Sequence, residues 1–502
     1  MKRKAKKAAT SETDDTGDLG KPSHESATSS TGAAPSAGRT PNYRVIALII
    51  ACALFMEQMD ATVLATALPT MAREFGVQAP SMSIALTSYL LALAVFIPIS
   101  GRLADRFGSR TMFEIAIFLF LLGSILCGQA RGVAFIVVSR LIQGLGGAMM
   151  IPIGRLVLLR TVAKRDLISA MSWLIMPAML GPMVGPPLGG FIVTYFDWRW
   201  IFYLNIPMAL LGLVLVRTFI ANVREAKPPP IDFAGFMLSG VSLGCLLFGF
   251  ELMSWKGEEI HALTLIGIGL VAGLLYIRYA HRHADPVLDL SLMQVPSFRL
   301  SVIAGSLTRI TQGAQPLLLP LLFQLGFGLS PVTSGTITVA GAVAAVWMKG
   351  LAQPLLRRFG FRHSLIFNGI AASAGYAICG FFRPGWPIPL IFAILAVCGT
   401  FMSFQFTAYN TIAYDEIPRE RMSSATSFYS TFQQLMLSLG ICVGSATLQI
   451  AMLISGSDTL KPIDFTFAFM LVTTISLAAT YWNWKFAADA GAELRGHRVH
   501  KE

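Results

Sequence analysis

The sequence places three ionisable side chains inside long apolar stretches, where a charge normally has a partner or a function. Asp60 and Glu57 lie three residues apart in one stretch, and Arg140 lies in another. At 1.5 Å per residue, Asp60 lies about 13 Å and Arg140 about 10 Å from the same face of a membrane. The matching depth predicts a buried ion pair. We assign proton coupling to Asp60, with Arg140 as its charge partner and Glu57 as an auxiliary acid. The alternative is a structural ion pair that never titrates.

Polar side chains in other apolar stretches predict a substrate-binding cavity. Arg309 lies in the middle of one such stretch, with Gln312 about one helical turn later. A central arginine costs about 2.5–3.5 kcal/mol to place in a membrane, so we expect it to face a cavity. Two further residues are assigned to the same cavity, Gln143 and Lys349. Lys349 lies nearer the end of its stretch and could instead extend to the membrane surface.

The sequence predicts no cofactor. It has no GxxxxGK[ST] loop that would bind phosphate, and its seven histidines lie outside the centres of the apolar stretches. All six cysteines lie within apolar stretches and none has CxxC spacing, so neither a metal site nor a disulfide framework is expected. We therefore expect a protein that is not an enzyme and that draws its energy from a proton gradient.

The elements that hold these residues are predicted to be membrane-spanning helices. Of the 502 residues, 54% are hydrophobic and 13% are charged, and the mean hydropathy is +0.63. A spanning helix needs about 20 apolar residues. Fourteen stretches qualify, which predicts an all-α polytopic membrane protein. They are 45–68, 83–101, 111–130, 133–154, 167–195, 201–221, 233–254, 262–280, 301–325, 332–354, 364–382, 388–412, 423–453 and 465–486.

The distribution of basic residues predicts the orientation of these helices. With fourteen spans both termini lie on one face, and thirty lysines and arginines fall on that face against six on the other. Loops rich in Lys and Arg stay in the cytoplasm. We therefore expect both termini to be cytoplasmic.

An internal repeat predicts the domain organisation. The pattern Arg-Phe-Gly-x-Arg occurs at 106–110 and again at 358–362, each time after the second span of a six-span block. Repeats of this kind build transporters whose substrate site lies between two halves. We predict a 6+2+6 arrangement. Its parts are a disordered cytoplasmic tail (1–44), an N-terminal half (45–222), a linker with two inserted helices (223–299), a C-terminal half (300–486) and a cytoplasmic tail (487–502).

Several motifs make the sequence similar to a known family. Segment 101–110 reads GRLADRFGSR, segment 140–148 reads RLIQGLGGA, and segment 181–190 reads GPMVGPPLGG. Segments 60–69 (DATVLATALP) and 198–207 (WRWIFYLNIP) add to the likeness. Over about 45–486 the sequence resembles the major facilitator superfamily, and within it the fourteen-helix drug:proton antiporters of the EmrB/QacA type. GGAMMIPIGR at 146–155 is most similar to MdtD-type exporters.

Two of these motifs have a physical interpretation of their own. In the loop at 101–110, Asp105 could accept hydrogen bonds from amides at the start of the next helix, while Arg106 and Arg110 bind acidic or carbonyl partners. We predict a cytoplasmic latch there, made by Gly101, Asp105, Arg106, Gly108 and Arg110. The alternative is that these charges only set the orientation. The fifth span carries a Gly/Pro motif in which close helix approach and bending are expected, formed by Gly181, Pro182, Gly185, Pro186, Gly189 and Gly190.

The sequence therefore predicts a proton-coupled secondary exporter that works by alternating access. The resemblance implies export of drugs or other amphipathic small molecules, whereas the basic residue at 309 favours an organic anion, such as a carboxylate or a metal–carboxylate complex. A non-transporting membrane sensor is a more distant alternative. The expected partners are a small-molecule substrate, protons and the lipid bilayer, and no nucleic acid, with a periplasmic adaptor left open. The expected location is the inner (plasma) membrane of a bacterium.

Overall fold

The computed structural model describes residues 43–162, 167–225, 230–253, 255, 257–418, 421–456, 459–487 and 490–491. Residues 41–502 form one compact unit. Most of the two tails predicted from sequence, 1–44 and 487–502, lies outside the described residues. Every regular element among the described residues is a helix.

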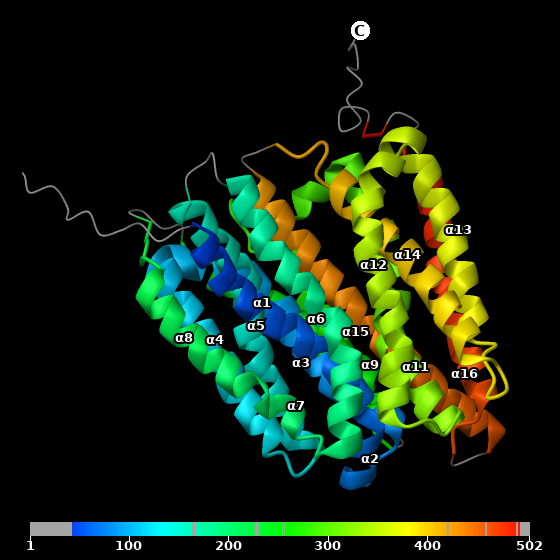
Figure 1. Cartoon of the computed structure of the whole chain (residues 1–502). Coiled ribbons are helices and arrows are strands. Elements are labelled where there is room, and N and C mark those ends of the chain that lie inside the picture. Colours follow the sequence, from blue (N-terminus) through cyan, green and yellow to red (C-terminus); the bar gives the residue numbers. More distant parts are fainter. Residues whose placement is uncertain are drawn as a thin grey trace, which may run out of the picture. The chain divides into compact units, whose positions relative to one another are not determined.

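The helices follow one another with short connections (Figure 1). The first group is α1 (Tyr43–Val63), η1 (Leu64–Thr66), α2 (Leu68–Phe75), η2 (Ala79–Ser83), α3 (Ile84–Phe107), α4 (Ser109–Gly128), α5 (Val133–Thr161), α6 (Leu167–Tyr195), α7 (Trp200–Tyr203) and α8 (Asn205–Phe219). The inserted helices are α9 (Phe233–Leu252) and α10 (Glu259–Ala280). The second group is η4 (Leu290–Gln294), α11 (Pro296–Leu321), η5 (Leu322–Gly326), α12 (Pro331–Phe359), α13 (Phe361–Cys379), α14 (Ile388–Ile412), α15 (Met422–Ser455), α16 (Pro462–Leu477) and α17 (Ala479–Trp484).

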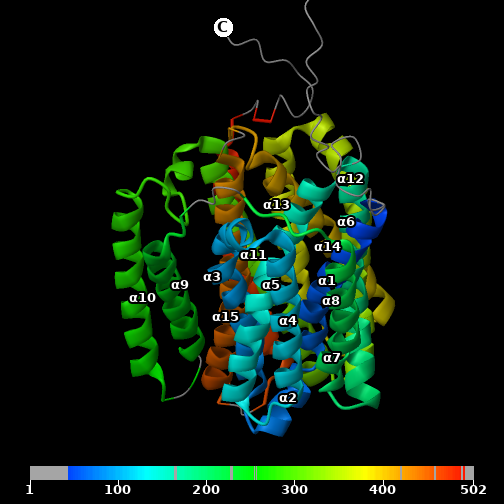
Figure 2. The ribbon, with the colours of Figure 1, turned by 90° about the vertical axis from the view of Figure 1, so that its left-hand side faces the viewer.

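Most packing takes place within each group. In the first group α1 packs on α6, and α5 packs on both α3 and α4; in the second, α12 packs on α14 and α11 on α15. The two groups meet where α6 contacts α12 and where α3 contacts α15. The hairpin of α9 and α10 stands beside this second contact, and α9 touches both α3 and α15 (Figure 2). The inserted hairpin therefore borders both groups.

Twelve helices of the described chain are long and apolar enough to cross a membrane. The fourteen spans predicted from sequence also require α11 and α13, which fall outside those twelve. In α11 the reason is its polar content, because Thr308, Arg309, Thr311, Gln312 and Gln315 lower its hydropathy. A helix shielded by its neighbours does not need an apolar surface, and 19 of the 26 residues of α11 are buried. The count of fourteen stays a prediction.

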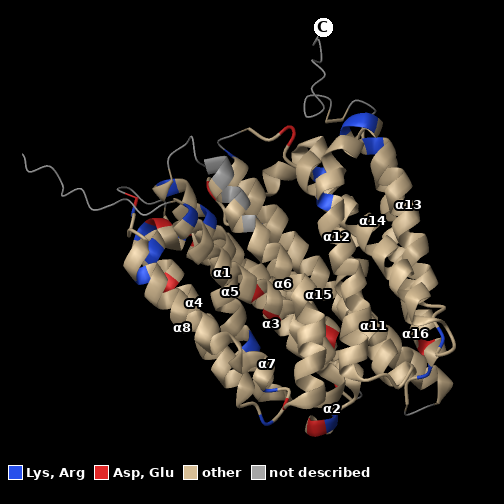
Figure 3. Ribbon diagram, in the orientation of Figure 1, with Lys and Arg blue, Asp and Glu red and all other residues tan. Residues whose placement is uncertain are grey.

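The repeated Arg-Phe-Gly-x-Arg motif forms the same kind of turn twice. Gly108 ends α3 with φ 100°, and Gly360 ends α12 with φ 74°. This backbone conformation is open to glycine and strained for other residues. The two turns lie at one end of the unit, which we call the basic end because arginines gather there (Figure 3). Those near the two turns are Arg102, Arg106, Arg110, Arg160, Arg357, Arg358 and Arg362.

The opposite end, which we call the α2 end because α2 and η2 lie there, is where the two groups are hydrogen-bonded to each other. The bonds join Gln324 to the Thr66 carbonyl (3.1 Å), the Val332 amide to Thr194 (3.1 Å), Ser445 to the Pro80 carbonyl (2.8 Å) and Gln449 to Ser81 (3.0 Å). Apolar side chains of α1, α2, α11 and η5 fill the space between them. The structure is therefore closed at its α2 end.

Candidate functional site

Asp60 on α1 and Arg140 on α5 form a fully buried ion pair. Arg140 Nη1 lies 2.6 Å from Asp60 Oδ2, and both side chains have an exposed fraction of 0%. The structure thus brings together the two residues whose equal depth predicted contact. Their role in proton coupling stays a prediction.

Two more helices, α3 and α8, supply partners to this ion pair directly, and α4 contacts it through Gln143. Asp60 Oδ1 accepts hydrogen bonds from Gln143 Nε2 at 2.9 Å and from Asn205 Nδ2, on α8, at 3.0 Å. Arg140 Nε donates to the Ala85 carbonyl on α3 at 2.9 Å. Ser124 on α4 accepts from Gln143 at 2.8 Å. A change in the charge of Asp60 would therefore alter contacts with α3, α4, α5 and α8.

Glu57 lies one turn before Asp60 and is 3% exposed. Its Oε2 atom has no hydrogen-bond partner among the described residues, and neither has the hydroxyl of Tyr89. The Tyr89 ring lies against the other side of the ion pair, with its centroid 4.5 Å from the Arg140 guanidinium carbon. Buried polar groups nearly always have partners. Two polar groups beside the ion pair, on Glu57 and Tyr89, are thus left without a partner among the described residues.

Arg309 is buried in the second group, on α11, and is 3% exposed. Its Nη2 donates to the Tyr429 hydroxyl at 3.3 Å, and its guanidinium lies 5.0 Å from the Tyr429 ring and 5.5 Å from the Phe406 ring. The Nε atom has no partner. Within the described part of the chain, Arg309 forms no ion pair, and Asp60 is paired with Arg140 instead. A buried cation with aromatic neighbours results.

The other residues assigned to a substrate cavity lie on three helices, α5, α11 and α12, from both groups. Gln312 is buried one turn after Arg309 on α11, and Lys349 is exposed on α12. Gln143 lies in the Asp60 network of the first group. That these residues line a common cavity stays a prediction.

The predicted latch forms ion pairs, but not the bonds that we expected for Asp105. Its Oδ1 accepts from Arg160 Nη2 on α5 at 2.7 Å, rather than from amides at the start of α4. Those amides have other partners, because the Ser109 amide donates to the Val223 carbonyl and the Thr111 amide to the Asn222 side chain. The segment after α8 therefore accepts the hydrogen bonds from α4 amides that we predicted for Asp105.

Of the remaining latch residues, some have the contacts that were predicted and others do not. Arg110 donates to the Ile220 carbonyl at 3.4 Å, as the prediction of a carbonyl partner requires. Arg106 instead lies over the ring of Phe107, 6.0 Å from its centroid. A side chain at Gly108 would clash with Asn222, whereas Gly101 has open space around it. Close approach thus explains the glycine at 108 but not the one at 101.

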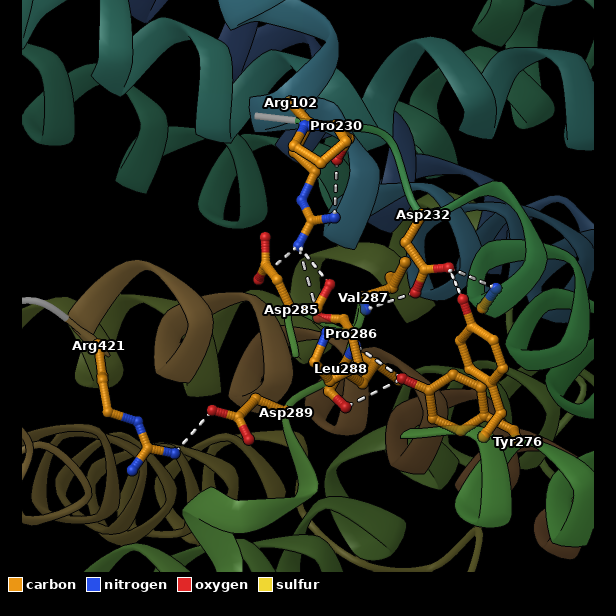
Figure 4. A network of polar contacts seen from close by, with 12 residues as sticks. Arg102, Pro230, Asp232, Tyr276, Asp285, Pro286, Val287, Leu288, Asp289 and Arg421 are labelled. Carbon is orange, nitrogen blue, oxygen red and sulfur yellow. Dashed lines mark hydrogen bonds and ion pairs between the residues drawn. The ribbon is translucent and has the colours of Figure 1, made fainter. Parts of the chain in front are cut away.

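A linker between α10 and α11 joins the two groups at the basic end (Figure 4). Arg102, at the end of α3, pairs with Asp285 at 3.0 Å, and Arg421, just before α15, pairs with Asp289 at 2.6 Å. Burial alone would raise the pKa of Asp289, but hydrogen bonds from Ser291 and Arg421 outweigh it and lower this pKa. The first group, the linker and the second group are thereby connected through charged side chains.

The Gly/Pro motif of α6 packs against α1 and α12. Side chains at Gly181, Gly185 and Gly189 would clash with residues 58–66, which belong to α1 and η1. One at Gly190 would clash with the Pro331 carbonyl at the start of α12, and Pro186 lies against Gly335. Pro182 lies within the helix, with Pro177, Pro186 and Pro187. The motif therefore lies at two contacts, one within the first group and one between the groups.

Two buried polar residues were not predicted from the sequence as part of a site. Asn205 bonds directly to Asp60, and its position in the WRWIFYLNIP segment was the only signal for it. Glu251 on α9 is 1% exposed and contacts both groups. An acidic residue in an apolar helix is a detectable signal, but Glu251 lies three residues from the end of the span predicted at 233–254, where a charge can reach the membrane surface.

The sequence matches the Major Facilitator Superfamily over residues 50–441. Among its relatives, HsrA of Haemophilus influenzae, named as a candidate transport protein, is 33% identical over 90% of this chain and 98% of its own length. MdtD of Serratia proteamaculans, named as a candidate multidrug resistance protein, is 35% identical over 79% of this chain and 83% of its own. The predicted similarity to MdtD-type proteins is confirmed.

Solved structures of transporters have a fold similar to that of this chain. A D-xylose–proton symporter aligns with a TM-score of 0.64 at 16% identity, over 89% of this chain and 98% of its own. The peptide-transporter-family protein PepTSo aligns with a TM-score of 0.66 at 13% identity, over 92% and 100%. At these identities the likeness concerns the fold.

Proposed function

Because the chain belongs to the major facilitator superfamily, we propose that it is a proton-coupled exporter that carries drugs or other amphipathic small molecules by alternating access. It is a transporter rather than an enzyme, and its relatives include proteins named for multidrug resistance. The observation that carries the proposal is the buried Asp60–Arg140 pair with Glu57 beside it. Ionisable groups inside membrane helices commonly serve as proton relays.

The contacts of Asp60 supply a mechanism for coupling. With Asp60 ionised, its carboxylate holds Arg140, Gln143 and Asn205 at once. A proton on Asp60 removes the charge that these donors share and weakens each charge-assisted bond. Glu57, buried with an unbonded oxygen, fits this site best as a neutral acid, because an unpaired buried charge is costly. Glu57 can then pass its proton to Asp60 when the ion pair opens.

The proposed membrane arrangement follows from the charges. The basic end is the cytoplasmic face, by the excess of Lys and Arg there, and the α2 end is the outer face. In this arrangement the conformation described is closed on its outer side. Fourteen helices, with α11 and α13 shielded by their neighbours, span the inner membrane of a bacterium. The proton gradient is the only energy source in the proposal, with no cofactor, and a periplasmic adaptor is not part of it.

Transport into inverted membrane vesicles tests the proposal. Respiration acidifies the interior of such vesicles, so an exporter should accumulate its substrates there. A panel of labelled lipophilic cations and carboxylates should include compounds that accumulate only when the protein is present, and an uncoupler should abolish the accumulation. Accumulation that persists with the uncoupler would refute proton coupling, and no accumulation of any compound would refute export of these classes.

Export of an organic anion is a second candidate, and Arg309 favours it. The guanidinium is buried among aromatic rings, and no carboxylate of the described residues pairs with it. A carboxylate substrate would supply the missing counter-charge. In the same vesicles, competition between an anion and a cation would decide between the candidates: an anion exporter accumulates the carboxylate and is not inhibited by the cation.

A further inference from the structure

The helix α10 of the inserted hairpin lies at the edge of the molecule and packs chiefly on α9 (Figure 2). It is long and apolar enough to cross a membrane. In a bilayer, side chains of this kind face the lipid tails, which are as apolar as they are. More than half of the surface is exposed on Ile260, Leu263, Leu270, Val271, Leu274 and Leu275.

An open apolar groove of about 470 Å³ runs along α10 beside α9. It is lined by Leu238 of α9 and by Thr264, Gly267, Ile268, Val271, Ala272 and Leu275 of α10. The hydroxyl of Thr264 donates to the Ile260 carbonyl of its own helix at 2.7 Å, so it adds little polarity to the groove. Leu275 lies eleven residues after Thr264, which is about 16 Å along a helix. This length is close to half of the hydrocarbon thickness of a bilayer, which is about 30 Å in total.

A second hollow adjoins the groove at the basic end, and Leu275 lines both of them. Its other lining residues are Arg278, Tyr279, Arg282 and His283. Arg278 is exposed one turn after Leu275, and Arg282 is exposed just after the end of α10. The rings of Tyr279 and His283 stack with their centroids 5.0 Å apart. Two guanidinium groups therefore border the place where the apolar groove ends.

Two carboxylates near this hollow are engaged with other groups. Asp232 accepts hydrogen bonds from the Tyr279 hydroxyl at 2.6 Å and from the Val287 amide at 3.2 Å. Asp285 pairs with Arg102 at 3.0 Å (Figure 4). Their charges are used by the linker and by α3, so the two arginines give the hollow a positive character.

A ligand that fits both parts has a negative head and an apolar chain. Arginine binds phosphate oxygens through two parallel N–H groups, and basic pockets between membrane helices bind the head groups of lipids. A free phosphate would leave the apolar groove unused. A zwitterionic lipid would fill the groove but bring its own cation to the arginines. A phospholipid with a net negative charge uses both parts.

We propose that the inserted hairpin binds an anionic phospholipid, with the phosphate at Arg278 and Arg282 and one acyl chain in the groove of α10. The site lies outside the Asp60 network and away from Arg309. The inference therefore goes beyond the proposed function, because it depends neither on the solute that is carried nor on proton coupling.

Photo-cross-linking of the full-length protein in vesicles tests this proposal. The vesicles consist of phosphatidylcholine with a trace of phosphatidylglycerol that carries a photoreactive group in its acyl chain, and peptide mass spectrometry locates the labelled residues. We expect labelling of residues 264–275 that exceeds the labelling by photoreactive phosphatidylcholine about tenfold, the equivalent of one charge-assisted hydrogen bond. Equal labelling by the two lipids would overturn the proposal.

Variants of the basic hollow test the head-group contact. Arg278→Gln combined with Arg282→Gln should reduce labelling by phosphatidylglycerol to the level of phosphatidylcholine. Arg357→Gln combined with Arg358→Gln is the matched control, because it removes two exposed arginines of the basic end that lie on α12. Labelling by phosphatidylglycerol that persists in the first double variant would contradict the assigned contact.

Variants of the groove test the place of the acyl chain, and they decide the matter if the arginine variants fail to fold. Gly267 lines the groove and has open space around it, so Gly267→Leu should fill the groove without a clash and abolish the preference for phosphatidylglycerol. Gly244→Leu, on α9 and equally open, should preserve it. A preference that survives in Gly267→Leu would show that the chain does not lie in the groove.

A competitor distinguishes a lipid site from a site for soluble phosphate. Glycerol phosphate, added at the concentration of the photoreactive lipid, should leave the labelling unchanged, because it cannot use the groove. Displacement of the label would overturn the proposal, since the hollow would then bind phosphate groups without a lipid chain.

Discussion

At the scale of single residues, Arg309 separates the two candidate substrate classes. Its guanidinium is buried, stacks near two aromatic rings and keeps one nitrogen without a partner. Aromatic rings stabilise a cation. Arg309 can therefore stay charged without a neighbouring carboxylate until an anionic substrate binds. The same arrangement would repel a cationic drug. We therefore expect Arg309 to select the charge of the substrate.

Arg309→Gln should weaken an anionic substrate far more than a cationic one. Loss of a charge-assisted hydrogen bond costs about 1.5–3 kcal/mol, or roughly 10- to 150-fold in affinity. Competition of a carboxylate and a lipophilic cation against one labelled substrate measures both effects. Arg309→Lys, which keeps the charge, should lose less. Equal losses for both classes would mean that Arg309 is structural and that the anion candidate is wrong.

A second residue-scale prediction concerns acid stability at the α2 end. The pKa of Glu74 is lowered, chiefly by its hydrogen bond from Arg199, which lies 2.6 Å away. The ion pair therefore contributes stability above the unfolded pKa of about 4.3, and the contribution is lost as pH falls through the lower folded value. Glu74→Gln should lower the Tm at neutral pH, and the difference from the unsubstituted protein should shrink below about pH 4. A difference independent of pH would contradict this assignment.

At the scale of elements, the contact of α6 with α1 depends on small residues. The three glycines at 181, 185 and 189 recur every four residues, so they form one face of α6. A side chain on any of them would meet α1 near Gln58 or Thr62, or η1 at Thr66. Since Asp60 lies in this part of α1, the same contact sets the position of the proposed proton site.

Gly185→Leu should abolish transport while the protein still folds and inserts. The larger side chain would meet the Thr62 hydroxyl and the Met59 carbonyl, and so hold α1 away from α6. Uptake into inverted vesicles measures transport, and size-exclusion chromatography checks folding. Gly350→Leu is the matched control, because Gly350 has open space around it. Normal transport by Gly185→Leu would show that close approach is not needed.

At the scale of the whole molecule, closure at the α2 end and the linker at the basic end hold one conformation. Gly190 lets α6 meet the start of α12, and Gln324 and Ser445 add hydrogen bonds across the same end. At the basic end the halves are joined through the linker, by Arg102 and Arg421. Alternating access requires the first set of contacts to break.

Gly190→Leu should therefore shift the protein towards opening at the α2 end. Its side chain would collide with the Pro331 carbonyl, a backbone atom that cannot move aside as a flexible side chain would. Spin labels at Tyr195 and Ser330, both exposed, should report longer distances than in the unsubstituted protein. An unchanged distance distribution would show that this contact does not hold the α2 end closed.

Much of this architecture could be predicted from the sequence, because apolar stretches and depth follow from counting residues. The pairing of Asp60 with Arg140 is an example. The helix ends were harder to predict. α3 runs to Phe107 and α5 to Thr161, beyond the spans predicted at 83–101 and 133–154. Hydropathy detects the part of a helix within the hydrocarbon, while its polar continuation depends on packing at the basic end.

The partners of polar residues could not be predicted, because they come from distant parts of the chain. Asp105 pairs with Arg160 because α5 ends beside the α3–α4 turn. Asn205 reaches Asp60 only through the packing of α8 on α1. Glu251 is an acidic residue in an apolar helix, but its burial follows from the packing of α9 against α3 and α15. Each case needs the tertiary arrangement of at least two helices.

The most direct test of the central claim is proton-driven transport by Asp60→Asn in reconstituted proteoliposomes. Asparagine keeps the shape of the side chain but carries no titrating charge. We predict that an imposed pH gradient drives accumulation by the unsubstituted protein but not by Asp60→Asn, while the variant still exchanges labelled for unlabelled substrate when no gradient is present. Gradient-driven accumulation by Asp60→Asn at the normal rate would contradict the proposed role of the Asp60–Arg140 pair.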